Sequence, residues 1–220
     1  MDRRNIILAS GSPRRREFLQ ALGLSFTVFT ADIDESPQPG ETPVALAARL
    51  AQTKARTVAR ALPPERRPAL VIAADTVVAL GDTLLGKPQD PEDAVAMLQR
   101  LREREHWVHT GLCLFATPDG RLLSRVNSTR VVMRPYTDPE IRAYVRSGDP
   151  LDKAGGYAIQ HRDFAPVQLL EGCAAGVMGL PLADLRDLLA EFGVTITAPL
   201  PQVCSRLTGL PCCQEKPESR

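Results

Sequence analysis

A chain of 220 residues, 44% hydrophobic and 24% charged, is long enough and apolar enough to fold around a substantial core as one globular domain. Its 27 lysines and arginines balance 26 acidic residues, which excludes the global basic field that attracts nucleic acid or a membrane surface. Any anion binding must therefore come from local clusters, and we expect neither a nucleic acid nor a membrane as a partner.

The sequence also limits the compartment and the cysteine chemistry. No apolar run reaches the length that spans a bilayer, and the first residues lead into a strand without the apolar core of a secretory signal. We therefore expect a cytoplasmic protein. Five cysteines, an odd number without a C-x-x-C pair, indicate neither a disulfide framework nor a zinc site.

The first predicted element is a short apolar strand over residues 6–9, followed by a Ser/Gly turn and a helix that begins at Pro13. Ser12 is a favourable N-cap for this helix. A helix N-terminus carries unpaired N–H groups and a partial positive charge, which suits an anion. Two serines, Ser10 and Ser12, and three arginines at residues 14–16 indicate a phosphate or carboxylate ligand. The alternative is an ordinary strand–turn–helix with a solvated basic first turn.

Two charged features follow in the next predicted strand, loop and helix. After an alternating strand over residues 25–30, an acidic loop at residues 32–40 is either solvated or holds a cation through Glu35. A helix is predicted over residues 43–62, and Lys54 falls within its apolar stripe at helical spacing. This lysine either buries only its stem, with its amine at the edge of the core, or points into the rim of a site.

A continuous apolar run over residues 69–74 predicts a strand that is buried on both faces and delivers Asp75 and Thr76 at its end. A carboxylate there is costly to bury unless it is paired or bound to a metal ion. The alternative is a polar residue at an ordinary strand end. A hairpin turn at residues 81–82 comes next, and Lys87, ordinarily a loop lysine, precedes the following helix.

The second half of the chain predicts two long strands over residues 106–117 and 121–134, with helices that begin near residues 137 and 181. Early alternation of strands and helices, followed by a long hairpin, favours a mixed α/β sheet.

The paired glycines within residues 152–160 indicate backbone in close approach to another group. Residues 201–220 contain proline and cysteine, and we expect them to form a loosely ordered tail after one domain of residues 1–200.

Taken together, seven features resemble the signature of the Maf family of nucleotide pyrophosphatases. They are ASGSPRR at residues 9–15, Glu35, Lys54, AADTVV at 73–78, GKP at 86–88, DKAGGYAIQ at 152–160 and VMGLPL at 177–182. The resemblance covers nearly all of residues 5–200. It implies an α/β fold similar to inosine triphosphatase, with an elongated mixed sheet in two lobes and a central cleft.

The resemblance implies hydrolysis of a nucleoside triphosphate to the monophosphate and pyrophosphate, with Mg²⁺ or Mn²⁺ as cofactor. Asp75 resembles the family's catalytic base, which activates water against the α-phosphorus, and Glu35 and Asp75 would be the metal ligands. The expected substrate contacts are Ser10, Ser12, Arg14, Arg15, Lys54, Thr76, Lys87 and Gln160.

Arg14, Thr76 and Gln160 resemble the residue set of the dTTP/UTP branch of the family. A glutamine amide matches the donor and acceptor edge of uracil or thymine, and modified pyrimidine nucleotides are included in this expectation. The alternatives are the 7-methyl-GTP branch and a non-catalytic nucleotide-binding regulator of cell division. A homodimer is compatible with the resemblance.

Three residues depart from the family's pattern, which usually has Gly, Ser and Tyr where this chain has His161, Cys173 and Ala174. These departures bear on local loop geometry and substrate range more than on the reaction.

Overall fold

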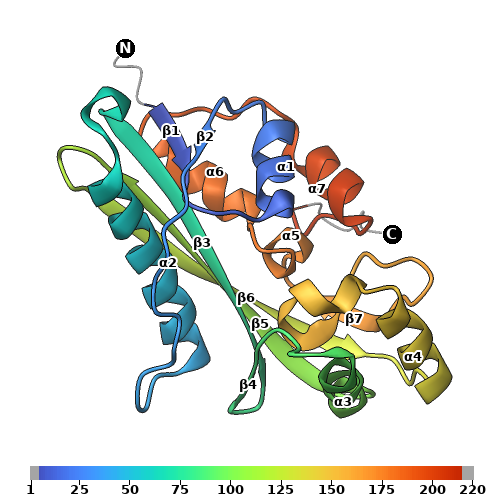
Figure 1. The fold of residues 1–220 in the computed structure, drawn as a ribbon. Helices are drawn as coiled ribbons and strands as arrows, with labels where there is room; N and C mark the ends of the chain where they lie inside the picture. Colours follow the sequence, from blue (N-terminus) through green and yellow to red (C-terminus); the bar gives the residue numbers. More distant parts are fainter. Residues whose placement is uncertain (1–4, 215–220) are drawn as a thin grey trace.

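The computed structural model describes residues 5–214 of the chain, and its strands form one mixed sheet in the order β2-β1-β3-β5-β6-β7, with β4 paired to β3 (Figure 1). β1 pairs in parallel with both β2 and β3, whereas the remaining pairs are antiparallel. The strands are β1 (Asn5–Leu8), β2 (Thr27–Val28), β3 (Ala69–Leu80), β4 (Thr83–Leu85), β5 (Glu105–Ala116), β6 (Leu122–Met133) and β7 (Val167–Glu171).

Most of the longer helices begin as the sequence predicts, with a polar cap followed by proline in the first turn. The caps Ser12, Thr42, Asp90 and Thr137 each accept a hydrogen bond from the backbone N–H three residues later. The helices are α1 (Pro13–Ala21), α2 (Pro43–Ala61), α3 (Pro91–Leu101), α4 (Asp138–Arg146), α5 (Ala174–Val177), α6 (Leu182–Ala190) and α7 (Leu200–Thr208), with 3₁₀ turns at Pro64–Arg66, Asp149–Asp152 and Ala154–Gly156.

Three strands of twelve residues each, β3, β5 and β6, run the length of the molecule and give it two lobes (Figure 1). α2 covers one face of these strands. On the other face, α1, α5, α6 and α7 cover one end, and α3 and α4 cover the other. The expected elongated α/β sheet is therefore confirmed, and apolar side chains fill the space between the sheet and the helices on both of its faces.

Strand pairing along the β1 side of β3 is interrupted in the middle of the strand. β1 pairs with Ala69–Ile72 on this edge and β4 pairs with Val78–Leu80, whereas β5 pairs along the whole opposite edge. Within the described chain, residues 73–77 therefore have no strand beside them on the β1 side. The sequence predicted Asp75 at a strand end. It lies instead in the middle of a long strand, at this gap, because the apolar run resumes directly after Thr76.

Two other expectations about the elements differ from the structure. The strand expected over residues 25–30 is only the two-residue β2. The expected loose tail is wrong for its first part, because residues 200–208 form α7. Its buried side chains Leu200, Val203 and Cys204 recur at helical spacing and pack against the main core. Residues 215–220 of the expected tail lie outside the described residues.

Across residues 5–214, no helix combines the length and the apolar character that a membrane crossing requires.

Candidate active site

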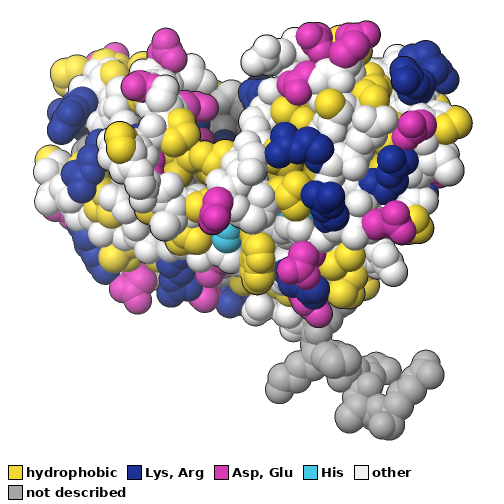
Figure 2. Space-filling view, turned by 90° about the horizontal axis from the view of Figure 1, so that it is seen from below, with side chains coloured by type: hydrophobic (Ala, Val, Ile, Leu, Met, Phe, Trp, Pro, Cys, Tyr) yellow, Lys and Arg dark blue, Asp and Glu magenta, His cyan; other side chains and the backbone are white. Residues whose placement is uncertain are grey.

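A cavity of about 750 Å³ opens at the gap in the edge of β3, and Figure 2 shows the surface hollowed between the two lobes. Its wall combines the β1–α1 turn, one side of α2, the middle of β3, the segment after β4, residues 152–160 and residues 177–179. Every residue that the sequence proposed for the site lines this cavity, namely Ser10, Ser12, Arg14, Arg15, Glu35, Lys54, Asp75, Thr76, Lys87 and Gln160.

The β1–α1 turn presents a helix N-terminus to the cavity. The Ser12 hydroxyl accepts from the Arg15 backbone N–H, and the Ser12 N–H donates to the Ser10 hydroxyl at 3.2 Å. The first turn of α1 carries no acidic residue, and Ser12, Pro13 and Arg14 all line the cavity. In the described part of the chain, neither Arg14 nor Lys87 forms an ion pair, so both cations face the cavity without a protein counter-ion.

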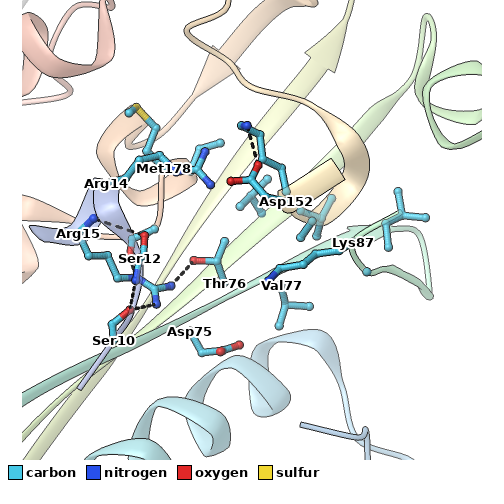
Figure 3. Close-up of a pocket in the computed structure, with 18 of the residues that line it drawn as sticks. Ser10, Ser12, Arg14, Arg15, Asp75, Thr76, Val77, Lys87, Asp152 and Met178 are labelled. Atoms are coloured by element: carbon cyan, nitrogen blue, oxygen red, sulfur yellow. Dashed lines mark hydrogen bonds and ion pairs between the residues drawn. The ribbon is translucent and has the colours of Figure 1, made fainter. Parts of the chain in front are cut away.

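Arg15 is held by the protein itself, which the sequence did not indicate. Its guanidinium donates to the Gly179 carbonyl at 2.8 Å, to the Ser10 hydroxyl at 3.0 Å and to the Thr76 hydroxyl at 3.3 Å (Figure 3). Burial lowers the pKa of Arg15, while nearby Asp75 opposes this change. The side chain therefore joins the turn, β3 and the α5 segment, and adds positive potential to the cavity.

A compact ionic cluster lies on the α2 side of β3. The Lys54 ammonium is 2.6 Å from Glu35 Oε1 and 2.5 Å from Asp75 Oδ1. The sequence left two positions open for the Lys54 ammonium, the edge of the core or the rim of a site. In the structure it points into the rim of the cavity. Burial raises the pKa of Asp75, and the charge of Lys54 acts in the opposite direction. This carboxylate is therefore more basic than an exposed aspartate and is held by a single cation.

Thr76 belongs to a different network, because neighbouring strand residues point to opposite faces of the sheet. Its hydroxyl is 3.0 Å from that of Thr110 on β5, and Thr110 donates to the Gly176 carbonyl at 2.8 Å. In Figure 3, Lys87 extends from the β4 side toward Thr76 and Asp75. The free edge thus lets two consecutive residues, Asp75 and Thr76, contribute to one cavity from opposite faces.

The far wall is a tightly constrained loop. Gly155 and Gly156 both have positive φ, and the Gly155 N–H donates to the Gly86 carbonyl at 2.9 Å, one residue before Lys87. Tyr157 is buried, with its hydroxyl 2.6 Å from His106 Nε2, and the other ring nitrogen of His106 has no partner in the described chain. The paired glycines therefore seat this loop against the β4 segment, as their predicted close approach requires.

Gln160 lies at the end of this loop with its side-chain oxygen, Oε1, buried and without a hydrogen-bond partner in the described residues. An unpaired buried acceptor is costly, and Gln160 is one of the residues that line the cavity. A ligand with an N–H donor would satisfy it.

The sequence did not select Asp152 and Lys153, which also line the cavity. The Lys153 ammonium contacts the Asp149 backbone carbonyl, and it pairs with the Asp149 carboxylate at 2.9 Å and with that of Asp152 at 2.7 Å. The available signal was the motif at residues 152–160, which begins with Asp152 and Lys153 and was assigned only Gln160 as a substrate contact. Nothing in the sequence marked Thr110. Gly179 lies in the motif at residues 177–182, but the motif gave no role to its carbonyl.

Comparison with known proteins gives one consistent result. Residues 5–192 match the family described as Maf-like protein. The chain is 45% identical to the dTTP/UTP pyrophosphatase of Pelotomaculum thermopropionicum, covering 88% of this chain and 99% of that protein. It is 48% identical to the dTTP/UTP pyrophosphatase of Myxococcus xanthus, covering 89% and 96%. The enzyme of the same name from Chromobacterium violaceum is 45% identical, covering 86% and 94%.

The match spans the whole cavity wall, from the β1–α1 turn to the segment after α5. The chain therefore belongs to the Maf family.

Proposed function

We propose that the chain hydrolyses nucleoside triphosphates, with dTTP and UTP preferred, to the monophosphate and pyrophosphate. The observation that carries this proposal is the composition of one cavity. It is lined by a buried carboxylate paired with an ammonium, a helix N-terminus, Gln160, and two cations that form no ion pair within the described residues. The names of the relatives, dTTP/UTP pyrophosphatases at 40–48% identity, support it.

The cationic side of the cavity suits the triphosphate. Arg14, Lys87 and the N–H groups at the start of α1 can contact phosphate oxygens, and Arg15 adds charge behind them. Stabilising the charge that develops on the departing pyrophosphate is the contribution these groups make to the rate.

Asp75 is placed to activate water. Lys54 holds its Oδ1, so Oδ2 accepts the proton of a water molecule as the water oxygen bonds to the α-phosphorus. The bridging bond between the α- and β-phosphates breaks, and its electron pair leaves with pyrophosphate. Lys54 keeps Asp75 ionised and oriented before the attack.

A divalent cation fits the same residues. Glu35 and Asp75 already share one cation, the Lys54 ammonium, so their oxygens can converge on a common charge. In residues 5–214 no three His, Cys, Asp or Glu side chains form a metal site, and an ion here would take its other ligands from phosphate and water. Mg²⁺ and Mn²⁺ accept that ligand set, and such an ion would neutralise phosphate charge when bound.

Gln160 recognises the base through its side-chain amide. Its Oε1, which has no hydrogen-bond partner among residues 5–214, can accept from N3–H of uracil or thymine, while its amide N–H₂ donates to a ring carbonyl. Cytosine has no proton on N3 and carries an amino group, which reverses this pattern, and purines are larger. A small substituent at C5 of the pyrimidine would leave the contact intact, so modified pyrimidine nucleotides belong to the same class.

The decisive assay measures pyrophosphate release with Mg²⁺ or Mn²⁺ from dTTP, UTP, CTP, ATP, GTP and 7-methyl-GTP. We expect the highest kcat/KM values of these nucleotides for dTTP and UTP. Preference for 7-methyl-GTP would assign the chain to the other branch of the family. Binding of dTTP without pyrophosphate release would contradict the enzymatic proposal and favour a nucleotide-binding regulator.

A further inference from the structure

One side chain of α4, Tyr144, contacts the chain on both sides of Gln160. The backbone N–H of Ala158, two residues before Gln160, donates to the Tyr144 hydroxyl at 3.0 Å. The ring of His161, the residue after Gln160, packs edge-on against the Tyr144 ring, with the ring centroids 4.7 Å apart. Within residues 5–214, Tyr144 is not among the residues that line the cavity. Its connection to the cavity therefore runs through Ala158 and His161.

These two contacts fall at the ends of the turn that presents Gln160. The His161 N–H donates to the Ala158 carbonyl at 3.2 Å. Residues 159 and 160 are therefore the central residues of a turn. Because residues 157–162 contain no helix or strand, the hydrogen bonds of regular secondary structure do not hold this turn in place. The orientation of the Gln160 amide therefore depends on how the two ends of the turn are anchored.

Tyr144 is itself held firmly. Its ring stacks on that of Phe164 with the centroids 4.4 Å apart, and its hydroxyl donates to Asp149 Oδ2 at 2.7 Å. Asp149 is held in turn by the Lys153 ammonium, 2.9 Å from its Oδ1. Burial raises the pKa of Tyr144, and the hydrogen bond to Asp149 acts in the same direction, so the hydroxyl stays protonated. Its proton goes to Asp149, and its lone pairs remain available to the Ala158 N–H.

His161 is fixed by the same aromatic cluster. Its Nδ1 accepts from the Phe164 N–H at 3.1 Å, and the Phe164 ring is the one that stacks on Tyr144. The turn is therefore anchored by a hydrogen bond at one end and by a ring contact at the other, and Tyr144 makes both.

We propose that Tyr144 is a positioning residue for base recognition: by anchoring both ends of the turn of residues 158–161, it sets the orientation of the Gln160 amide. This inference rests on the proposed function, in which Gln160 contacts the base. The proposed triphosphate contacts Arg14 and Lys87 belong to other segments, the first turn of α1 and the segment after β4. Loss of the anchor should therefore weaken binding of the base and leave the chemical step largely unchanged.

Tyr144→Phe removes only the hydroxyl and leaves the ring contacts with His161 and Phe164. We expect KM for dTTP to rise about tenfold and kcat to stay within about twofold, because a displaced amide loses hydrogen bonds to thymine. Calorimetry with dTTP and CTP analogues that carry a methylene bridge between the α- and β-phosphates measures binding without hydrolysis. The preference for the dTTP analogue should fall about fivefold. An unchanged preference, or a loss confined to kcat, would overturn the proposal.

Tyr136→Phe is the matched control. Tyr136 is also buried, its ring also packs against Phe164, and its hydroxyl donates to the Leu98 carbonyl at 2.8 Å. This variant loses a buried tyrosine hydroxyl from the same aromatic cluster, but not the one that contacts the turn. We expect the binding and kinetic constants of the natural chain. An equal rise in KM in both variants would assign the effect to general loosening of the cluster and overturn the proposal.

Amide hydrogen exchange tests the anchor without nucleotide, so it stays decisive if the proposed function fails. In the full chain, followed by nuclear magnetic resonance, Tyr144→Phe should speed exchange of the Ala158 N–H at least about tenfold, whereas Tyr136→Phe should not. Unchanged exchange would overturn the anchoring role. A natural chain that binds the dTTP analogue but releases no pyrophosphate from dTTP would contradict the proposed function alone, and the analogue preference would still decide the role of Tyr144.

Discussion

At the scale of single residues, the proposed chemistry depends on Asp75 and Lys54, and each of these charged side chains is stabilised by the other. The carboxylate is buried in the middle of a strand and the ammonium lies within an apolar helix stripe, yet the two are 2.5 Å apart. Removing either charge leaves the other buried without its partner, which costs more than the pair contributes. Substitutions at these positions must therefore be measured for stability as well as for turnover.

Asp75→Asn keeps the shape of the side chain and removes its charge. If Asp75 accepts the proton of the attacking water, turnover should fall by at least ~100-fold, the scale of a general base or a metal-positioning group. Steady-state pyrophosphate release, with circular dichroism as the folding control, measures this. Near-normal turnover in a folded variant would remove Asp75 from the catalytic role.

Lys54→Met separates a packing role from a role in the site. Methionine fills the apolar stripe of α2 but cannot hold Glu35 and Asp75. We expect a folded protein whose melting temperature is lower, because Asp75 loses its buried partner, and whose turnover is at least ~10-fold lower. Retained activity would mean that the lysine only packs.

Gln160→Glu tests how the base is read. An ionised glutamate accepts hydrogen bonds but cannot donate one to the ring carbonyl, while the triphosphate contacts stay in place. We expect kcat/KM for dTTP and UTP to fall roughly ten- to a hundredfold. The kcat/KM values of the natural chain for the same nucleotides are the reference. Unchanged values in the variant would refute the role of Gln160.

At the scale of elements, the contact between α2 and β5 controls where Lys54 lies. At Gly111 on β5 the two backbones approach closely, since a Cβ there would lie 2.1 Å from the Ala47 carbonyl oxygen of α2. The helix can approach the sheet this closely only because the strand has no side chain at that position.

Gly111→Ala should therefore push α2 outward and destabilise the fold by about 3 kcal/mol, because the obstruction is rigid backbone. Urea unfolding measures the free energy. Gly86→Ala is the matched control, since its added Cβ meets nothing within 4 Å. Equal stability of the two variants would show that α2 adapts freely.

The sequence predicts helix starts better than it predicts strand extent. Ser12, Thr42, Asp90 and Thr137 carry local capping signals, which act within three residues and can be read directly. By contrast, the extent of a strand depends on its partners. β2 is limited to two residues that pair with β1, and β3 continues through Asp75 because β5 pairs with it on both sides of that residue. Ten site residues could be named from the sequence, whereas Thr110 enters the site only through contacts across the chain, and the role of the Gly179 carbonyl depends on its contact with Arg15.

At the scale of the whole molecule, stability should respond to pH through buried His106. Burial lowers the pKa of this histidine to about 4, against ~6.5 in an unfolded chain. Between these values the unfolded chain binds more protons than the folded one. The free energy of unfolding should therefore be fully present above pH 6.5 and should decrease as the pH falls toward 4.

We expect a loss of about 2 kcal/mol between pH 7 and pH 4.5, measured by urea unfolding. Glu41 and Glu140, whose pKa values are about 2, act mainly below this window. His109 contributes in the same direction, because burial also lowers its pKa. His106→Gln retains a partner for the Tyr157 hydroxyl and should flatten the dependence. An equally steep dependence in this variant would assign the effect to other groups.

At the gap along β3, residues 73–77 form a short free edge although β3 lies within the sheet. By strand alternation, the N–H and C=O groups of Ala74 and Thr76 point toward the missing neighbour, as do those of Ile72, whose carbonyl accepts from Ala9. Unpaired edges usually invite strand addition from a second chain and aggregation. Here β1 and β4 close the opening at both ends after five residues, which is too short for a foreign strand to establish a register. Residues 73–77, which have no neighbouring strand on this side within the described chain, can therefore stay open to the cavity without promoting aggregation.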